Sequence, residues 1–447
     1  MSLNMKIAHN ETRTYKGVAI TSFAEDIDNG SMEQILNCAE IPSVEKIFIT
    51  PDVHKGYTAP IGSVIVTYGT IIPELLGNDI GCGISCCKLD ININELDDSD
   101  KFLKDLYNKL RDNNVLPINV RNKTKNEYLN NHINSVLEEI STSLYDFDEV
   151  DDERLLKLLQ WDDDELFKSM GTLGGGNHFV EICQDEEGEL FSVVHTGSRS
   201  YGSKVSQLCK ELCEKQKETI DRFFELTNIA KLYTQNIPFS TRTYSVELDS
   251  IRDLQHLGRM IKGLSCFEDI KSLIFSAEEF AYNNRKLIQS IIYKVANDIE
   301  DGQYYYGLTQ DNYIDTMHNC FEIYMNTIYH FKGVSYVENE PYAIIAGSQT
   351  SGSYIVACKR NKFIGSDFPF CSHGAGRVMS RTEARNTLDV AEEQAKLNAV
   401  VKYNTFNGEK SLEECTSAYK DIDRVIELQK DFVTPIKKLT PLINIKG

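Results

Sequence analysis

The segment Gly171-Thr172-Leu173-Gly174-Gly175-Gly176-Asn177-His178-Phe179-Val180-Glu181 joins a glycine-rich turn to an apolar run. Three adjacent glycines let the backbone approach a ligand closely, and the residues that follow favour a strand. The same pairing of a glycine burst with a β-branched run recurs along the chain. The bursts lie at 56–83, 171–176, 197–202, 347–352 and 374–376, and the runs are Ile61–Thr67, Phe179–Ile182, Ser192–Val194, Tyr342–Ile345 and Tyr354–Ala357. The sequence therefore predicts strands that present glycine-rich loops.

Helical periodicity fills the stretches between these bursts. Apolar residues recur at helical spacing within Phe267–Ile299, and Thr382–Val400 reads as a second helix with Thr382 as a good opening residue. We expect two segments, Asn94–Lys168 and Lys204–Gln303, to be helical excursions, with a separate domain there as the alternative. The prediction is a mixed α/β (α+β) fold in a single domain, residues 1–447, with glycine loops lining one cleft and helices at the periphery.

Charge and cysteine content restrict the class of protein. The chain has 447 residues and a formal net charge of −20, which argues against nonspecific binding of nucleic acid by a broadly basic surface. A polyanion must be held by a focused site, with metal ions as one source of positive charge. The 12 cysteines form no C-x₂-C pair of a structural zinc site. Without an apolar run of membrane-span or signal-peptide length, we expect a cytoplasmic protein with no membrane partner.

Five of the nine histidines lie within or beside clusters of Gly, Asn or Ser: His54, His178, His195, His318 and His373. One such histidine is more often a hydrogen-bonded structural residue than a ligand, but five in the same kind of loop favour a shared role. Asp79 and Cys82 lie three residues apart in a glycine-punctuated turn, where both can face one ion. The alternative is a tight turn with a small buried cysteine. Thiolate, carboxylate and imidazole together suit a first-row transition metal, and carboxylate sites with open positions suit manganese.

Features suited to phosphate accompany these histidines. Arg199 and Arg377 each follow a histidine by four residues and can pair with phosphate oxygens. His373 lies in a turn of small residues, where an exposed imidazole can be a nucleophile. The segment 171–181 is not a P-loop, because no Gly-Lys-Ser/Thr follows its glycines. A floppy hairpin is the alternative interpretation of that segment.

Taken in order, these motifs resemble the signatures of the RtcB family of GTP- and manganese-dependent RNA ligases. The motifs are Pro51–Gly56, Asp79–Gly83, Gly171–Glu181, His195–Arg199, His318-Asn319, Ser372–Arg381 and Pro441–Gly447. Each is short, but the set follows the family's order and covers nearly the whole chain. The resemblance implies an RtcB-like fold, in which strands and glycine-rich loops form a central metal and nucleotide cleft.

The resemblance also implies the residues of the site. Two manganese ions would be held by five ligands, namely Asp79, Cys82, His178, His195 and His318. Cys82 would bridge both ions. His373 would attack the α-phosphate of GTP and carry the guanylate. The residues that fall where the family contacts the guanylate are Asn177, Glu181, Asn319, Ser348, Ser353, Ala375, Gly376, Arg377, Tyr419 and Lys446.

By the same resemblance, the partners are RNA ends. A 2′,3′-cyclic phosphate would be opened to a 3′-phosphate, receive GMP from the histidine and then be attacked by a 5′-hydroxyl, in RNA repair or tRNA splicing. We expect a monomer. One alternative is a metal-dependent phosphoesterase that opens cyclic phosphates without ligating, which needs no protein nucleophile at His373. A second is a catalytically silent RNA-end-binding protein, against which the intact set of metal-type residues argues.

The chain departs from the family pattern in three places. Ile71–Gly77 lacks the Gly-Gly turn of many archaeal and animal members and resembles a bacterial subgroup. Thr196 stands where serine is usual. Gly347–Ser353 differs from the usual Gly-Ser-Met-Gly-Thr pattern, which bears on nucleotide specificity more than on metal binding.

Overall fold

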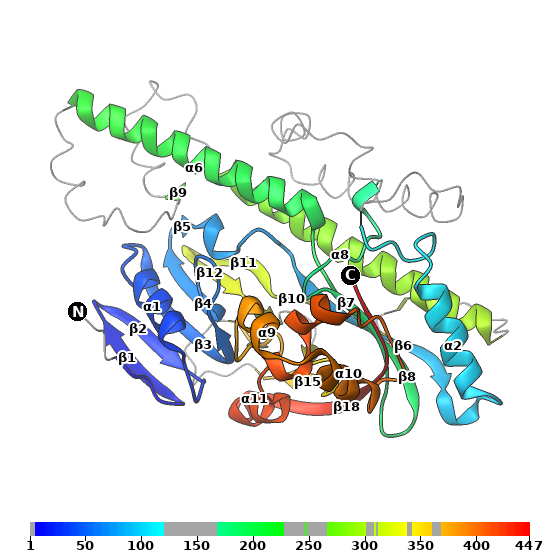
Figure 1. The fold of residues 1–447 in the computed structure, drawn as a ribbon. Coiled ribbons are helices and arrows are strands. Elements are labelled where there is room, and N and C mark those ends of the chain that lie inside the picture. Colours follow the sequence, from blue (N-terminus) through cyan, green and yellow to red (C-terminus); the bar gives the residue numbers. More distant parts are fainter. Residues whose placement is uncertain are drawn as a thin grey trace.

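The computed structural model describes residues 5–119, 168–227, 246–247, 266–300, 308–309, 312–337, 342–359 and 368–447. Strands and helices alternate through these residues, and two large sheets lie beneath two long helices (Figure 1). The mixed α/β fold class is confirmed. Among the described helices, none is long and apolar enough to cross a membrane.

The first sheet has six strands in the order β1-β2-β3-β4-β12-β11. In that order they are Glu11–Tyr15, Val18–Ser22, Val44–His54, Ile61–Tyr68, Thr327–Lys332 and Asn319–Tyr324. Helix α1 (Asn29–Cys38) connects the parallel strands β2 and β3. Its N-cap, Asp28, accepts a hydrogen bond from the Ser31 backbone N–H, and its apolar face joins the core beside this sheet.

The second sheet follows the order β10-β6-β8-β7-β18-β15-β14, with β17 paired to β18. These strands are Tyr313–Met317, Gly83–Asn92, Glu189–Thr196, Phe179–Gln184, Val433–Lys446, Ser353–Cys358, Tyr342–Ala346 and, for β17, Tyr403–Asn404. Two small pairs complete the strands, β13 (Val334–Tyr336) with β16 (Phe370–Ser372) and β5 (Thr70–Ile71) with β9 (Val246–Glu247). All five predicted runs lie in strands, namely β4, β7, β8, β14 and β15.

The long helices α6 (Arg199–Thr227) and α8 (Cys266–Ile299) run side by side, and α8 lies against β6 and β8 (Figure 1). The helical prediction for Phe267–Ile299 is confirmed. α8 also contributes fully buried residues to the core, including Arg285, Ile288 and Ile292. Within 94–168, helix α2 (Ser99–Leu110) is present and residues 120–167 lie outside the described chain.

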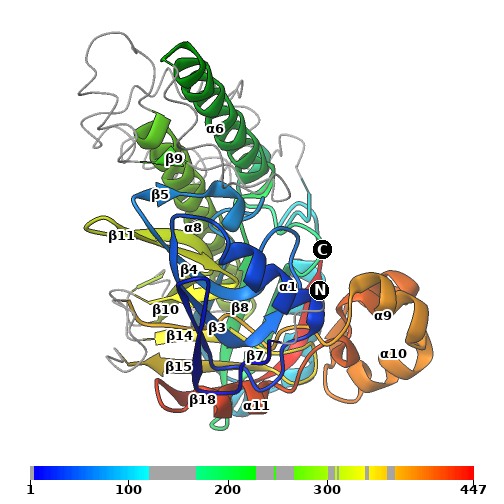
Figure 2. The same cartoon turned by 90° about the vertical axis from the view of Figure 1, so that its left-hand side faces the viewer.

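The predicted helix Thr382–Val400 is two helices, α9 (Arg381–Thr387) and α10 (Val390–Asn398). Leu388 is extended between them, and Asp389 caps α10 by accepting from the Glu392 backbone N–H. An N-cap side chain inside the apolar pattern divides the helix. The orthogonal view shows α9 and α10 projecting from one side of the sheets (Figure 2). The remaining elements are α11 (Ile422–Leu428) and the 3₁₀ turns η1 (Pro73–Leu75), η2 (Ile93–Glu95), η4 (Gly408–Glu414) and η5 (Thr416–Ala418).

Candidate metal and nucleotide site

A cavity of about 850 Å³ opens where the two sheets meet. Members of three glycine bursts line it, namely Gly56, Gly347, Gly374 and Gly376. Asn177 directly follows the burst at 171–176, and His195 lies two residues before the burst at 197–202. Both of these residues line the cavity. The glycine-rich loops therefore gather around one cavity.

The five expected metal ligands come from four segments that meet beside this cavity. Asp79 and Cys82 precede β6, His178 precedes β7, and His195 is the second-last residue of β8. His318 lies between β10 and β11, at the point where the chain passes from one sheet to the other. β6 pairs with both β8 and β10, so its start lies beside the ends of those strands. Strand pairing thus brings residues far apart in the sequence to one place.

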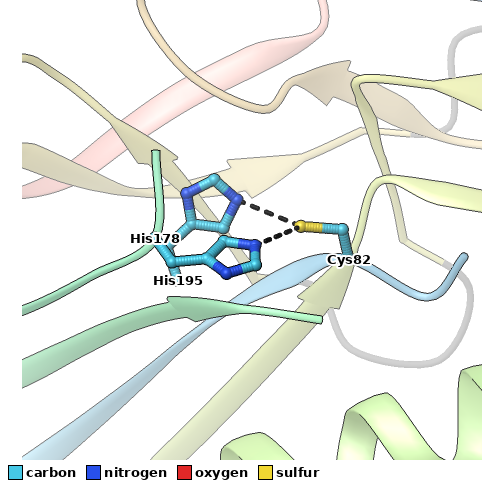
Figure 3. A group of neighbouring side chains, drawn as sticks. All are labelled: Cys82, His178 and His195. Atoms are coloured by element: carbon cyan, nitrogen blue, oxygen red, sulfur yellow. Dashed lines mark hydrogen bonds between the residues drawn. The ribbon is translucent and has the colours of Figure 1, made fainter. Parts of the chain in front are cut away.

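Cys82 lies at the centre of this group (Figure 3). Its Sγ is 3.6 Å from His178 Nε2 and 3.3 Å from His195 Nε2. His195 Nε2 is 3.3 Å from His318 Nε2, and His178 Nε2 is 3.0 Å from Asp79 Oδ2. The ligand atoms of Cys82, His178 and His195 all lie within 4.8 Å of one another. The structure thus brings all five side chains into one chain of contacts, which we call the ligand cluster.

The chemistry of the ligand cluster fits a divalent transition metal. Burial raises the pKa of the Cys82 thiol well above its ordinary value and lowers the pKa values of His195 and His318 well below theirs. The imidazoles are therefore neutral, which is the state that coordinates metals. Buried His318 Nδ1 has no hydrogen-bond partner among the described residues. A bound cation would favour the thiolate over the thiol and would offset the cost of burying these polar groups.

Two glycines leave space for ligand-cluster side chains. A Cβ on Gly197 would collide with the Asp79 carboxylate, and a Cβ on Gly174 would collide with the guanidinium of Arg199 and approach the His178 ring. Gly174 also has a φ of +94°, which L side chains rarely adopt. These glycines are therefore required both by the ligand side chains and, at Gly174, by the backbone.

His373 follows β16 and lies on the cavity wall beside the ligand cluster. Its Nδ1 is 2.7 Å from Oδ2 of fully buried Asp52, and its ring centroid is 4.7 Å from that of His318. Burial alone would raise the pKa of Asp52, but the hydrogen bond from His373 holds it below its ordinary value. The carboxylate therefore accepts from Nδ1–H, which leaves the Nε2 lone pair free to react.

A second polar group on the cavity wall is centred on Glu414, at the end of η4. Arg381 Nε lies 2.8 Å from its carboxylate, Arg377 Nη1 3.4 Å and Lys446 Nζ 3.8 Å, and the Tyr419 hydroxyl donates to it. The Arg377 guanidinium also lies over the Tyr419 ring, 5.1 Å from its centroid. Three cationic side chains thus gather around one buried carboxylate on the cavity wall, an arrangement that can bind a phosphorylated ligand.

Comparison with known proteins identifies the family. The family model described as tRNA-splicing ligase RtcB matches residues 34–447. The chain belongs to the RtcB family. It is 28% identical to the RNA-splicing ligase RtcB of Escherichia coli K12 over 430 residues, which cover 94% of this chain and 95% of that protein. It is 27% identical to the tRNA-splicing ligase RtcB of Methanococcus maripaludis over 489 aligned positions, which cover 95% and 92% of the two chains.

Most residues expected to contact a guanylate in this RtcB-family chain line the cavity. They are Asn177, Glu181, Asn319, Ser348, Ala375, Gly376, Arg377, Tyr419 and Lys446. Ser353 is buried but is not one of the lining residues. The Asn319 side chain bonds the backbone, donating to Asp79 O at 3.0 Å and accepting from Gly333 N at 3.1 Å. Asn319 therefore holds the turn that carries Asp79, whatever else it contacts.

Arg199 does not lie where the sequence analysis placed a phosphate ligand. Its guanidinium donates to Thr172 Oγ1 at 3.1 Å and lies 3.4 Å from His178 Nδ1, and it is absent from the cavity wall. Its backbone adopts a φ of +58° at the start of α6, which directs the side chain back toward His178. In this structure Arg199 supports a ligand-cluster residue instead of facing the cavity.

Four site residues carried no assigned role in the sequence analysis. Asp52 lay within a quoted motif, and Arg381 ended another, but their partners are far away in sequence. Glu414 lies outside every quoted motif. Lys332 lines the cavity from β12 and donates to Leu76 O at 2.7 Å, and burial lowers its pKa to about 8. Within the sequence, the one indication of a role for Asp52 was its position two residues before His54, one of the clustered histidines.

Proposed function

We propose that this RtcB-family chain joins RNA ends through a guanylate carried on His373, with GTP and manganese as cofactors. The substrates are an RNA with a 2′,3′-cyclic phosphate or 3′-phosphate end and an RNA with a 5′-hydroxyl end. The observation that carries the proposal is the contact between His373 and Asp52 on the cavity wall, beside the ligand cluster. An oriented imidazole, metal-type ligands and cationic side chains facing one cavity are the parts that phosphoryl transfer needs.

The first step is guanylylation of His373. Asp52 accepts from Nδ1–H, so Nε2 can attack the α-phosphorus of GTP. The Nε2–P bond forms as the bond to the pyrophosphate oxygen breaks. Positive charge then develops on the ring, and the Asp52 carboxylate stabilises it. Arg377 and Arg381 face the cavity and can offset charge on the departing phosphates.

The ligand cluster is the proposed manganese site. Asp79, Cys82, His178, His195 and His318 would hold two ions, with Cys82 in contact with two of the imidazoles. Manganese bound there supplies positive charge to phosphoryl oxygens as their negative charge increases. The described cysteines are free, which is typical of a reducing compartment, so we place the reaction in the cytoplasm, where the protein would act as a monomer.

RNA joining follows from the guanylated enzyme. Water first opens a cyclic end to a 3′-phosphate. An oxygen of that phosphate attacks the phosphorus of the guanylate, and the Nε2–P bond breaks. The 5′-hydroxyl of the second RNA then attacks the activated 3′-phosphorus, its proton passes to solvent, and GMP leaves. The products are a joined RNA and a free His373, in RNA repair or tRNA splicing.

Replacement of Asp52 by Asn should slow guanylylation strongly while leaving the fold intact. Asparagine is nearly isosteric, but its amide can donate to Nδ1 and so favour the tautomer that carries the proton on Nε2. We expect the rate of adduct formation to fall by about 10²- to 10⁴-fold. Single-turnover labelling with GTP measures this rate, and manganese content is the control. A rate within about twofold of wild type would show that Asp52 does not orient the nucleophile.

GTP affinity should rise with pH through neutrality. Glu181 lines the cavity, accepts from Asn444 Nδ2 at 2.7 Å, and burial raises its pKa to about 7. Only the ionised carboxylate can accept from two guanine N–H groups, so binding favours the form present above pH 7. We expect affinity to increase by about tenfold between pH 6 and pH 8. Calorimetric titration with GTP at each pH measures the affinity. The same titrations of Glu181→Gln show how much of the pH dependence comes from protonation of the nucleotide phosphates. If affinity rises with pH equally in the variant, Glu181 does not bind the guanine in this way.

The joining assay tests the proposed function directly. The chain is incubated with one RNA ending in a 2′,3′-cyclic phosphate and a second RNA beginning with a 5′-hydroxyl, then analysed by denaturing electrophoresis. A joined product should require both GTP and manganese and should be absent when the second RNA begins with a 5′-phosphate. Opening of the cyclic phosphate without joining would support the phosphoesterase alternative. Binding of the RNA without either reaction would support the silent RNA-end-binding protein.

A further inference from the structure

We infer that Asn284 and Arg285, adjacent residues of α8, position the four segments that carry the ligand cluster. The inference rests on the proposed function, because it concerns how this chain prepares its metal ligands. Both side chains are fully buried, and neither lines the cavity. They can therefore act on metal or nucleotide only through the residues they hold.

Arg285 connects three of the four segments. Its Nη1 donates to Gly81 O at 2.7 Å and to Thr196 O at 3.2 Å. Gly81 lies between Asp79 and Cys82, and Thr196 follows His195 directly. The other two guanidinium nitrogens, Nε and Nη2, donate to the Asp315 carboxylate at 2.6 and 2.7 Å. Asp315 lies on β10, three residues before His318. One guanidinium thus holds the backbone beside Asp79, Cys82 and His195 and, through the Asp315 side chain, the strand that leads to His318.

Asn284 connects the remaining segment. Its Oδ1 accepts from the Gly171 backbone N–H at 2.7 Å, and its Nδ2 donates to Thr172 O at 3.1 Å. This is the start of the glycine-rich turn that leads to His178. The same Nδ2 donates to Gly197 O at 3.2 Å, close to His195. Together the two side chains contact every segment that carries a ligand-cluster residue.

The residue at the start of β6 leaves space for the buried Arg285 side chain. A Cβ on Gly83 would lie 2.6 Å from Thr316 O and 2.7 Å from Arg285 Cζ, so the glycine at the start of β6 makes room for both the neighbouring strand β10 and the guanidinium. A buried guanidinium is costly, and an apolar side chain of similar volume would serve a purely structural contact at least as well. Arg285 retains its charge in a bidentate pair with Asp315 and directs Nη1 at two backbone carbonyls next to ligand-cluster residues, so its planar fork of donors fixes direction as well as distance.

Gln289 provides a matched comparison on the same helix. It is also fully buried and donates to Ser85 O at 3.1 Å and to Ser192 O at 3.3 Å. Ser85 and Ser192 lie on β6 and β8, three residues from Cys82 and His195, and so further along these strands than the carbonyls of Gly81 and Thr196, which directly adjoin Cys82 and His195. Replacement of Gln289 therefore measures how far Mn²⁺ affinity falls when the contact between α8 and the sheet is weakened in general.

The test measures manganese affinity in the full-length chain. Wild type, Arg285→Lys, Asn284→Ser and Gln289→Leu are stripped of metal and titrated with Mn²⁺ alone by calorimetry, and circular dichroism and thermal melting monitor the fold. The expected dissociation constants rise by about 10- to 100-fold for Arg285→Lys and Asn284→Ser, as for other residues that orient metal ligands, and by less than about threefold for Gln289→Leu. Asn284→Ser, which is neutral and smaller, covers the case in which Arg285→Lys fails to fold.

The outcomes separate this inference from the proposed function. Folded Arg285→Lys or Asn284→Ser with wild-type affinity would overturn the inference while the metal site stands. Equal weakening in Gln289→Leu would also overturn it, because the effect would then be general. A wild type that binds no Mn²⁺ would instead contradict the proposed function. High Mn²⁺ should restore guanylylation of the two positioning variants, which a loss of the nucleophile could not.

Discussion

His373→Ala should form no guanylate adduct and join no RNA, yet keep its manganese. The imidazole is the proposed attacking group, and alanine leaves no nitrogen in its place. We expect both activities to fall by at least about a thousandfold, as when a nucleophile is removed from other enzymes. Metal content should change little, because the ligand cluster does not include His373. Labelling with α-labelled GTP, gel assays of joining and metal analysis measure the three quantities.

His9→Ala is the matched control for loss of a histidine. His9 lies outside the cavity wall, and its ring contacts the Leu428 carbonyl at 3.1 Å. This variant should be guanylated at the wild-type rate. Guanylylation of His373→Ala at a comparable rate would mean that another residue carries the guanylate, and the role assigned to His373 would be wrong.

Cys82→Ser should lose manganese. Cys82 contacts both His178 and His195 through its sulfur, and a hydroxyl is a poorer ligand than a thiolate. We expect the dissociation constant for Mn²⁺ to rise by at least about tenfold, and guanylylation at limiting metal to fall in parallel. Titration of the metal-free protein measures the constant.

Cys86→Ser controls for the loss of a buried thiol. Like Cys82, Cys86 is buried, but it lies on β6, four residues further on, and does not line the cavity. The control should lose stability without losing metal affinity. Unchanged Mn²⁺ binding in Cys82→Ser, or equal loss in both variants, would show that Cys82 is not a ligand.

The strands were predictable because their signals are local. A β-branched run beside a glycine burst, as at Phe179–Gln184, specifies a strand and its turn within about ten residues. The position of α8 was not predictable in the same way. Asn284, Arg285 and Gln289 read as polar residues of a solvated face, yet they are fully buried because their partners are carbonyls and side chains on distant strands. The division between α9 and α10 was missed because Asp389 reads as an ordinary helix residue until its cap is seen.

In the site, too, local motifs were predictable from the sequence and long-range contacts were not. The ligand-cluster residues stood out because the histidines lie within or beside clusters of Gly, Asn or Ser and because Asp79 and Cys82 share a glycine-punctuated turn. Asp52 and His373 are 321 residues apart, and their contact depends on how β3 and β16 come together. Glu414 likewise acquires its role only when Arg377, Arg381 and Lys446 converge on it. Sequence motifs therefore predicted the groups that can react, and long-range packing determined which groups orient them.

The most direct measurement is guanylylation of the wild-type chain. The protein is incubated with manganese and α-labelled GTP, denatured, and separated by electrophoresis, and the labelled peptide is mapped by mass spectrometry. We expect one GMP per chain on His373, in a bond that is labile to acid and stable to alkali, as a phosphoramidate is. No adduct, or an adduct on a residue other than His373, in protein that has bound manganese would contradict this expectation.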